Sequence, residues 1–208
     1  MSDRSTLFAD LAAERITSFH DAHADDSAWI ASGTVTAPAD IWRDIEDNHR
    51  HNCGLWRQED LARRRDVADA EIAANKRAID RHNQARNDAI ERIDEALLAR
   101  LAKVVPRADA WHNSETAGVM IDRLSILSLK ILNMGREAER EDADDAHRSA
   151  CAAKLSRLNL QRADLSRCLD TLLASAADGR AFWRVYRQFK MYNDPALNPY
   201  LRSERRSS

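Results

Sequence analysis

Apolar side chains recur every three or four positions along most of the chain, which is the spacing of an amphipathic α-helix. Pro106 and Gly179 mark two helix ends, because proline interrupts a helix and glycine favours the turn that follows one. No convincing strand remains between the helical segments. We therefore expect an all-α fold, an antiparallel bundle of about five long helices. Their approximate ranges are 5–23, 39–64, 69–103, 113–138 and 145–176.

The remaining segments indicate one domain with less regular ends. Residues 25–38 combine turn formers with β-branched residues, so we predict a loop there. The composition of residues 182–192 favours a short aromatic helix. Residues 193–208 contain two prolines, and we expect them to form a strap and a tail. Because five aromatic side chains gather in 182–192, we expect this end to fold back on the bundle. We interpret 1–208 as a single helical-bundle domain with its core in about 39–192.

Polar residues interrupt the expected buried stripes of three helices. Arg162 breaks the leucine seam of the last long helix, and Asn83 and Arg86 break a run of isoleucines in the third. Burying a guanidinium without a partner costs several kcal/mol, so stability alone does not explain these residues. The second helix is the extreme case, with an expected buried stripe of Trp42, Ile45, His49, Asn52, Trp56, Glu59 and Arg63.

Two interpretations of these polar residues stay open. A hydrogen-bonded network could fix the register of the helices. Alternatively, a pocket between the helices could receive a small polar or anionic molecule, held by Asn52, Asn83, Arg86 and Arg162. In an enzymatic version of this pocket, His49 would carry the proton, and Glu59 would orient the imidazole or act as a second carboxylate. Whether the protein is an enzyme stays open at this stage.

Composition excludes several other classes of function. The five glycines lie too far apart for a glycine-rich nucleotide-binding loop. Three cysteines, without the spacing of a zinc site, fit a reducing cytoplasm. Glu46 and His49 form half of a di-iron motif whose second half is missing, so we assign no metal site and no cofactor. No run of about 18 apolar residues predicts a membrane span. We expect a cytoplasmic protein.

Charge is distributed unevenly between the two ends of the chain. Residues 1–48 contain 10 acidic and 3 basic side chains, whereas residues 178–208 contain 3 acidic and 7 basic ones. The basic tail is not accompanied by a nucleic-acid-binding motif, so we consider nucleic acid a disfavoured partner. An acidic surface of the same chain or of a second copy would suit the basic tail as well as nucleic acid would. We expect a homo-oligomer.

Three motifs are more specific than generic helix sequence: L-W-x-x-E-D at 55–60, I-D-R-L-S-I-L at 121–127 and Y-N-D-P-x-L-N-P at 192–199. Together with the segments between them, they resemble a bacterial all-helical family known as a domain of unknown function, over about residues 45–200. Ala117 departs from the proline expected after Glu115 and Thr116. The resemblance implies one shared architecture and no established activity.

Our leading hypothesis is a helical-bundle protein that binds or acts on a small polar or anionic molecule in a pocket between helices. The alternative is a non-catalytic adaptor or accessory protein, such as one that serves surface-glycan assembly. Its long third helix and its basic, aromatic C-terminus would then be docking surfaces.

Overall fold

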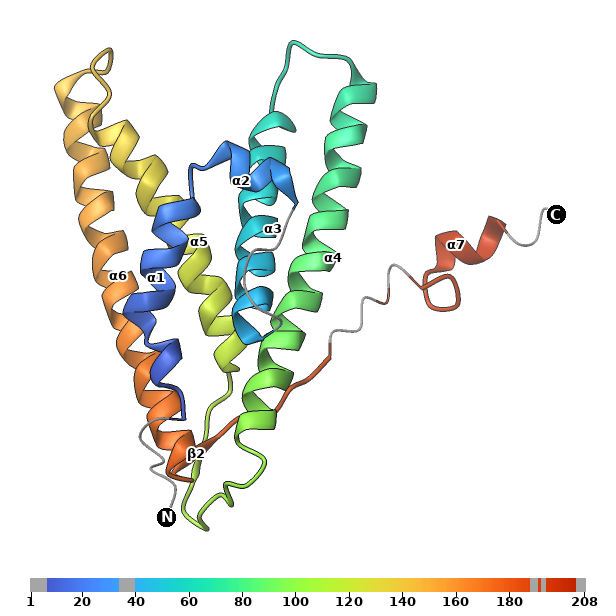
Figure 1. Ribbon diagram of the computed structural model, residues 1–208. Helices are drawn as coiled ribbons and strands as arrows, with labels where there is room; N and C mark the ends of the chain where they lie inside the picture. Colours follow the sequence, from blue (N-terminus) through green and yellow to red (C-terminus); the bar gives the residue numbers. More distant parts are fainter. Residues whose placement is uncertain (1–6, 34–39, 188–190, 192–193, 205–208) are drawn as a thin grey trace.

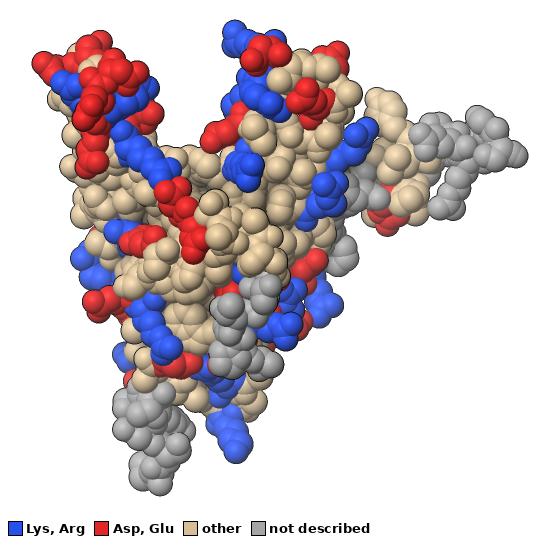
Figure 2. Space-filling model, turned by 45° about the horizontal axis from the view of Figure 1, so that its top comes forward, with Lys and Arg blue, Asp and Glu red and all other residues tan. Residues whose placement is uncertain are grey.

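Four long helices dominate the computed structural model, which describes residues 7–33, 40–187, 191 and 194–204. They are α3 (Ile41–Leu61), α4 (Asp69–Arg100), α5 (Ala117–Ala138) and α6 (Asp145–Ala177). As Figure 1 shows, α3 and α4 form one antiparallel hairpin and α5 and α6 a second, and the two diverge toward their connecting loops like the arms of a V. Figure 2 shows charged side chains of both signs crowding the two tips, with a notch between them. The all-α bundle predicted from the sequence is confirmed.

The first predicted helix is shorter than expected and is followed by a second helix. A 3-10 turn, η2 (Ala9–Leu11), precedes α1 (Ala13–His23), and residues 5–6 of the prediction lie outside the described residues. The prediction of a loop over 25–38 is wrong for 27–32, which form α2 (Ser27–Ser32), while 34–38 lie outside the described residues. Asp26 explains α2, because its side chain accepts a hydrogen bond from the backbone of Trp29 and caps the helix.

Local hydrogen bonds set where the long helices begin. Asp144 caps α6 by accepting from the backbone nitrogen of His147. Thr116 caps α5, so this helix begins four residues later than the predicted start at 113. Asp94 of α4 accepts a hydrogen bond of 2.7 Å from the backbone of Gly118, so the start of α5 is also tied to α4.

The C-terminal segment differs most from the sequence-based expectation. Ala181–Phe182 form β2, which pairs in parallel with β1 (Trp111–His112), so the chain contains a short strand pair where none was expected. Residues 183–187 are not helical, so the predicted aromatic helix is wrong for 182–187; residues 188–190 and 192 of that prediction lie outside the described residues. Strand pairing satisfies the backbone here and keeps Trp183 buried in the core. The final helix, α7 (Pro199–Glu204), stands away from the bundle in Figure 1.

The main apolar core lies where α1, α4, α5 and α6 meet. Its fully buried side chains include Ile16, Ile93, Leu124 and Leu169. A smaller cluster brings Trp29 of α2 against Cys53 of α3 and Leu129 of α5. The inward surface of α3 between these clusters is polar, and the candidate site lies there.

Candidate functional site

A groove of about 430 Å³ lies between α3, α4 and α5, and we call it the α3–α5 groove. Four of the six predicted site residues line it: Asn52 and Glu59 from α3, and Asn83 and Arg86 from α4. The two α3 residues precede the two α4 residues by at least 24 positions in the sequence, and the antiparallel pairing of the two helices brings them together. The other lining residues are Leu55, Trp56, Asp60, Arg63, Ile126 and Leu129.

A buried hydrogen-bond network continues from the Asn52 end of this groove into the bundle, and Asn52 is the member of it that lines the groove. Asp122 of α5 accepts hydrogen bonds of 2.9 Å from the side-chain amides of both Asn48 and Asn52. The same amide of Asn52 donates to Ser125 Oγ, also at 2.9 Å. Because Asp122 and Ser125 are three positions apart, they share one face of α5 and meet α3 together. Both amide protons of Asn52 are therefore used within the protein.

Arg86 is held less completely than the other residues at this end. Its Nη2 donates to Asn87 Oδ1 at 3.0 Å, while its Nε lies 3.9 Å from Asp122 Oδ1, beyond hydrogen-bond distance. That Nε is buried and has no hydrogen-bond partner among the described residues. A buried guanidinium donor without an acceptor is costly. Glu59, which the sequence suggested as the partner of His49, instead pairs with Arg63 at 2.7 Å.

His49 lies behind the groove and does not line it. Its side chain is fully buried, its Nδ1 lies 2.7 Å from Ser125 Oγ, and its ring stacks on His20 of α1 with centroids 4.6 Å apart. Burial lowers the pKa of His49 to about 3, with a further contribution from His23. Burial likewise raises the pKa of the neighbouring Cys53 thiol to about 12. The imidazole is therefore neutral and the thiol protonated at neutral pH.

The opposite side of α3 holds a buried ion pair that the sequence did not single out. Arg50 Nη2 donates to Glu46 Oε1 at 3.0 Å, and Trp29 Nε1 donates to the same oxygen at 3.3 Å. The guanidinium also donates to the carbonyl of Trp29 and lies 4.0 Å from the centroid of its ring. This pair attaches α2 to α3, so its contacts are structural.

Arg162 is not part of the groove. It lies on α6 and forms an ion pair with Asp21 of α1, in which its Nη1 donates to both carboxylate oxygens at 2.8 Å. The leucine seam of α6 faces the core only in its C-terminal half, so a residue in the middle of the helix lies at the edge of the bundle. The structure thus separates Arg162 from Arg86.

The network residues Asn48, Asp122 and Ser125 were absent from the sequence-based site. A signal existed, because Asp122 and Ser125 lie three positions apart within the motif at 121–127, on an otherwise apolar helix. Asn48 carried no such signal, since it lies beside the predicted stripe of α3 and not on it.

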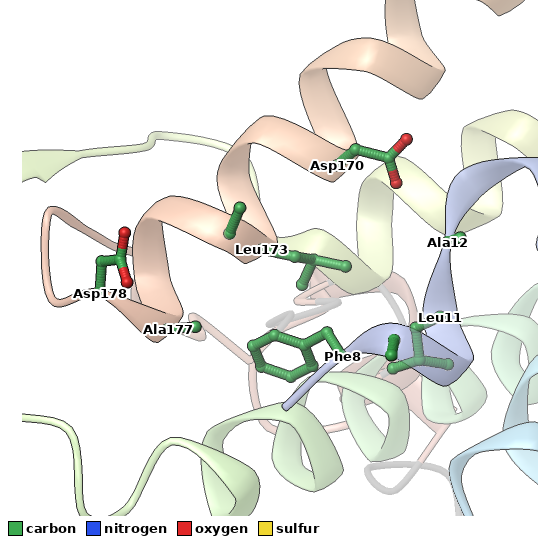
Figure 3. A pocket seen from close by; sticks show the side chains of 9 residues that line it. Phe8, Leu11, Ala12, Asp170, Leu173, Ala177 and Asp178 are labelled. Carbon is green, nitrogen blue, oxygen red and sulfur yellow. The ribbon is translucent and has the colours of Figure 1, made fainter. Parts of the chain in front are cut away.

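A second cavity, of about 300 Å³, lies against the C-terminal half of α6. In Figure 3 the ring of Phe8 lies beside Leu173 and Ala177 of α6, and Asp170 is near the start of α1. The carboxylate of Asp170 accepts a hydrogen bond of 2.9 Å from the backbone of Ala13. Apart from Asp170 and Asp178 the residues that line this cavity are apolar, and Asp170 is already engaged by the backbone of α1, so the α3–α5 groove is the better candidate site.

These observations define an all-α helical-bundle protein with polar side chains between its helices. No helix among the described residues is long and apolar enough to cross a membrane. Residues 42–185 match the family described as protein of unknown function DUF4254, so the chain belongs to that family. No curated protein and no solved structure matched the chain.

Proposed function

We propose that this protein binds a small polar molecule with an anionic group in the α3–α5 groove. The observation that carries the proposal is the buried Nε of Arg86, which has no hydrogen-bond partner among the described residues. Asn83 lies on the same helix one turn away and supplies an amide to the same groove. Trp56 adds an aromatic wall, so a ligand with both a charged group and an apolar or ring portion fits the lining.

The buried network supports binding by holding the groove in shape before a ligand arrives. Asn52 is fixed by Asp122 and Ser125, and Ser125 is fixed in turn by His49. Preorganised side chains lose little conformational entropy on binding, which favours affinity. In this proposal the network positions the wall of the groove, and Arg86 contacts the ligand.

The geometry favours binding over acid–base catalysis. A proton carrier must come within hydrogen-bond reach of its substrate, directly or through one water. His49 is fully buried behind Ser125, and the Glu59 carboxylate is held by Arg63. We therefore retain Asn52, Asn83 and Arg86 as the proposed ligand-binding residues and place His49 among the positioning residues.

The proposal is tested by thermal unfolding of the full chain with a panel of phosphates and carboxylates. At least one compound should raise the melting temperature, since a ligand at 100 times its dissociation constant stabilises by about 2.7 kcal/mol. Arg86→Met should abolish this shift. Arg162→Met is the matched control, because it removes the same charge from the Asp21 ion pair and should leave the shift intact.

The stability of the ligand-free variants distinguishes the binding proposal from a purely structural network. Arg86 has no acceptor at hydrogen-bond distance for its Nε, so Arg86→Met should cost little stability by itself. A loss of several kcal/mol that Asp122→Asn rescues, with no ligand-induced shift in the wild type, would identify a purely structural network and end the binding proposal.

The C-terminus supports the second candidate function, a non-catalytic adaptor that forms a homo-oligomer. α7 stands away from the bundle in Figure 1, and Tyr200 within it is 84% exposed. Exposed aromatic side chains on a projecting segment are suited to contact with a second chain. Removal of residues 194–208 should then reduce the mass measured by sedimentation and leave the melting temperature of the bundle unchanged; an unaltered mass would exclude this role for the segment.

A further inference from the structure

Two histidines contact each other where α3 packs against α4. His51 of α3 and His82 of α4 are both partly buried, and their Nδ1 atoms lie 3.2 Å apart. Two nitrogens bound to one tetrahedral zinc ion at about 2.0–2.1 Å from the metal are separated by about 3.3–3.4 Å. The observed separation of the two nitrogens is therefore close to the one that a shared cation requires.

Gly54 makes this arrangement sterically feasible. A Cβ placed on Gly54 would lie 2.6–2.9 Å from three atoms of the His82 ring, so any side chain at this position would displace the imidazole. Glycine inside a helix costs roughly 0.5–1 kcal/mol relative to alanine. The middle of α3 thus contains a destabilising residue whose missing side chain provides the space that the His82 ring occupies.

The surroundings orient His51 as metal ligands are usually oriented. Its other ring nitrogen, Nε2, lies 3.5 Å from Asp47 Oδ1, one turn earlier on α3. Arg92 of α4 holds Asp47 in turn, with Nη2 2.6 Å from Asp47 Oδ2. A carboxylate beside Nε2 favours the tautomer that carries its proton there, which leaves the lone pair of Nδ1 directed at His82.

From this geometry we propose that His51 and His82 form a binding site for a divalent transition cation such as Zn²⁺, which imidazole nitrogens commonly bind. No group of three or more His, Cys, Asp or Glu among the described residues is arranged to hold a metal. The chain therefore supplies two ligands, and water or a bound molecule completes the coordination. The site is separate from the α3–α5 groove, because neither histidine lines it. It was not predicted from the sequence.

Calorimetric titration of the full chain with Zn²⁺ tests the proposal. We expect one ion per chain, and a loss of affinity of at least about 10-fold in His51→Gln and in His82→Gln. His112→Gln is the control, since that histidine lies on β1 and contacts neither helix of the site. The absence of Zn²⁺ binding, or binding that survives both glutamine variants, would overturn the proposal.

Two further variants separate a metal site from a simple contact between rings. Gly54→Ala keeps both imidazoles but displaces His82, so it should weaken binding as much as His82→Gln does. Asp47→Asn should weaken it by about 10–100-fold, the usual effect of removing a carboxylate behind a histidine ligand. Asp44→Asn is its control, because Asp44 also pairs with Arg92 but has no contact with His51. Equal affinities in the two asparagine variants would remove Asp47 from the site.

One measurement needs no variant and so does not depend on the folding of mutants. Pulsed electron paramagnetic resonance of the wild-type chain loaded with one equivalent of Cu²⁺ counts the imidazole nitrogens coupled to the ion. Two coupled imidazoles are expected. A spectrum with one or none would place the ion elsewhere and contradict the proposal.

Discussion

The buried faces of α3 and α6 solve the same packing problem with different residues. α6 buries leucines and alanines in its C-terminal half, among them Leu169, Leu172 and Ala176. α3 buries two amides, a histidine and an ion pair, namely Asn48, Asn52, His49 and Glu46 with Arg50. Apolar contacts require only complementary shape, whereas every buried polar group also requires a correctly placed partner.

The difference shows where the structure is specific. A network of oriented hydrogen bonds admits one register of α3 against α5, while a leucine seam tolerates small shifts. It also shows where buried polar atoms lack hydrogen-bond partners in the described part of the chain. The side-chain nitrogens of His20 and the Nε of Arg86 are buried without hydrogen-bond partners among the described residues. His20 stacks on His49 of α3, and the Nε of Arg86 lies 3.9 Å from Asp122 of α5, which accepts hydrogen bonds from two asparagines of α3.

The largest effect is expected from breaking the ion pair of α3. Arg50→Met leaves the Glu46 carboxylate buried without its cation, and this should lower the free energy of unfolding by about 3–5 kcal/mol. Urea unfolding measures the loss. The double variant Arg50→Met/Glu46→Leu should recover most of it, because it removes both charges. A loss below about 1 kcal/mol in the single variant would show that α3 tolerates an unpaired buried charge, and it would contradict the view that each buried polar group of α3 requires its partner.

The second-largest effect on stability is expected from truncating a leucine in the apolar seam of α6. Leu169 is fully buried, so Leu169→Ala creates a cavity and should cost about 3 kcal/mol. Leu160→Ala on the same helix is the control, since that side chain is 62% exposed and its removal should be nearly neutral. Equal losses in the two variants, measured by the same urea titration, would refute the placement of the seam.

Acid should destabilise the polar side of the bundle through His20. Burial lowers its pKa well below the usual 6.5, and the neighbouring His49 and His23 lower it further. Above pH 6.5 the residue is neutral in both the folded and the unfolded chain, so its full contribution to stability is present. As the pH falls below 6.5, only the unfolded chain takes up the proton, and stability decreases by up to about 1.4 kcal/mol per pH unit for this group.

His20→Phe should therefore flatten the dependence of stability on pH between about 6.5 and 5. Urea unfolding at a series of pH values provides the measurement. His112→Phe is the control, because His112 is exposed and its replacement should leave the slope unchanged. An identical slope in wild type and His20→Phe would show that His20 does not remain neutral in the folded chain.

The smallest effect is expected from the ion pair between Arg162 and Asp21, which has the same chemistry as the pair on α3 but is partly exposed. Arg162→Met should change the free energy of unfolding by no more than about 1 kcal/mol, since solvent screens such pairs. A double-mutant cycle with Asp21→Asn measures the coupling. A coupling free energy as large as that of Arg50 with Glu46 would mean that burial does not determine how much each ion pair contributes to stability.

Much of the fold was predictable because helix formation depends on local spacing. The periods of apolar residues placed α3, α4, α5 and α6 within a few residues of their observed positions, and Gly179 follows the end of α6 with a φ of 72°. α2 was missed because six residues are too few to show a period. The aromatic helix was wrongly expected over 182–187 because the chain enters this segment as a strand, with Ala181 and Phe182 paired to Trp111 and His112 about 70 positions earlier.

The candidate site was predictable only in part, for a different reason. Asn52, Glu59, Asn83 and Arg86 share a groove because each belongs to a stripe that faces the neighbouring helix. Arg162 also belongs to a stripe, but its part of α6 lies at the edge of the bundle and meets Asp21. A stripe indicates which side of a helix faces inward, and it does not say which helix it meets.

The sequence by itself determined the helical class, the approximate ends of the long helices and the presence of polar residues on inward faces, since all three follow from the 3.6-residue period of one helix. Tertiary structure alone decided which residues meet across helices: Asp122 with Asn52, His20 with His49, and His51 with His82. Those contacts depend on the rotation of each helix about its axis and on the angle at which two helices cross. Neither quantity is a property of one segment, so neither could be derived from local spacing.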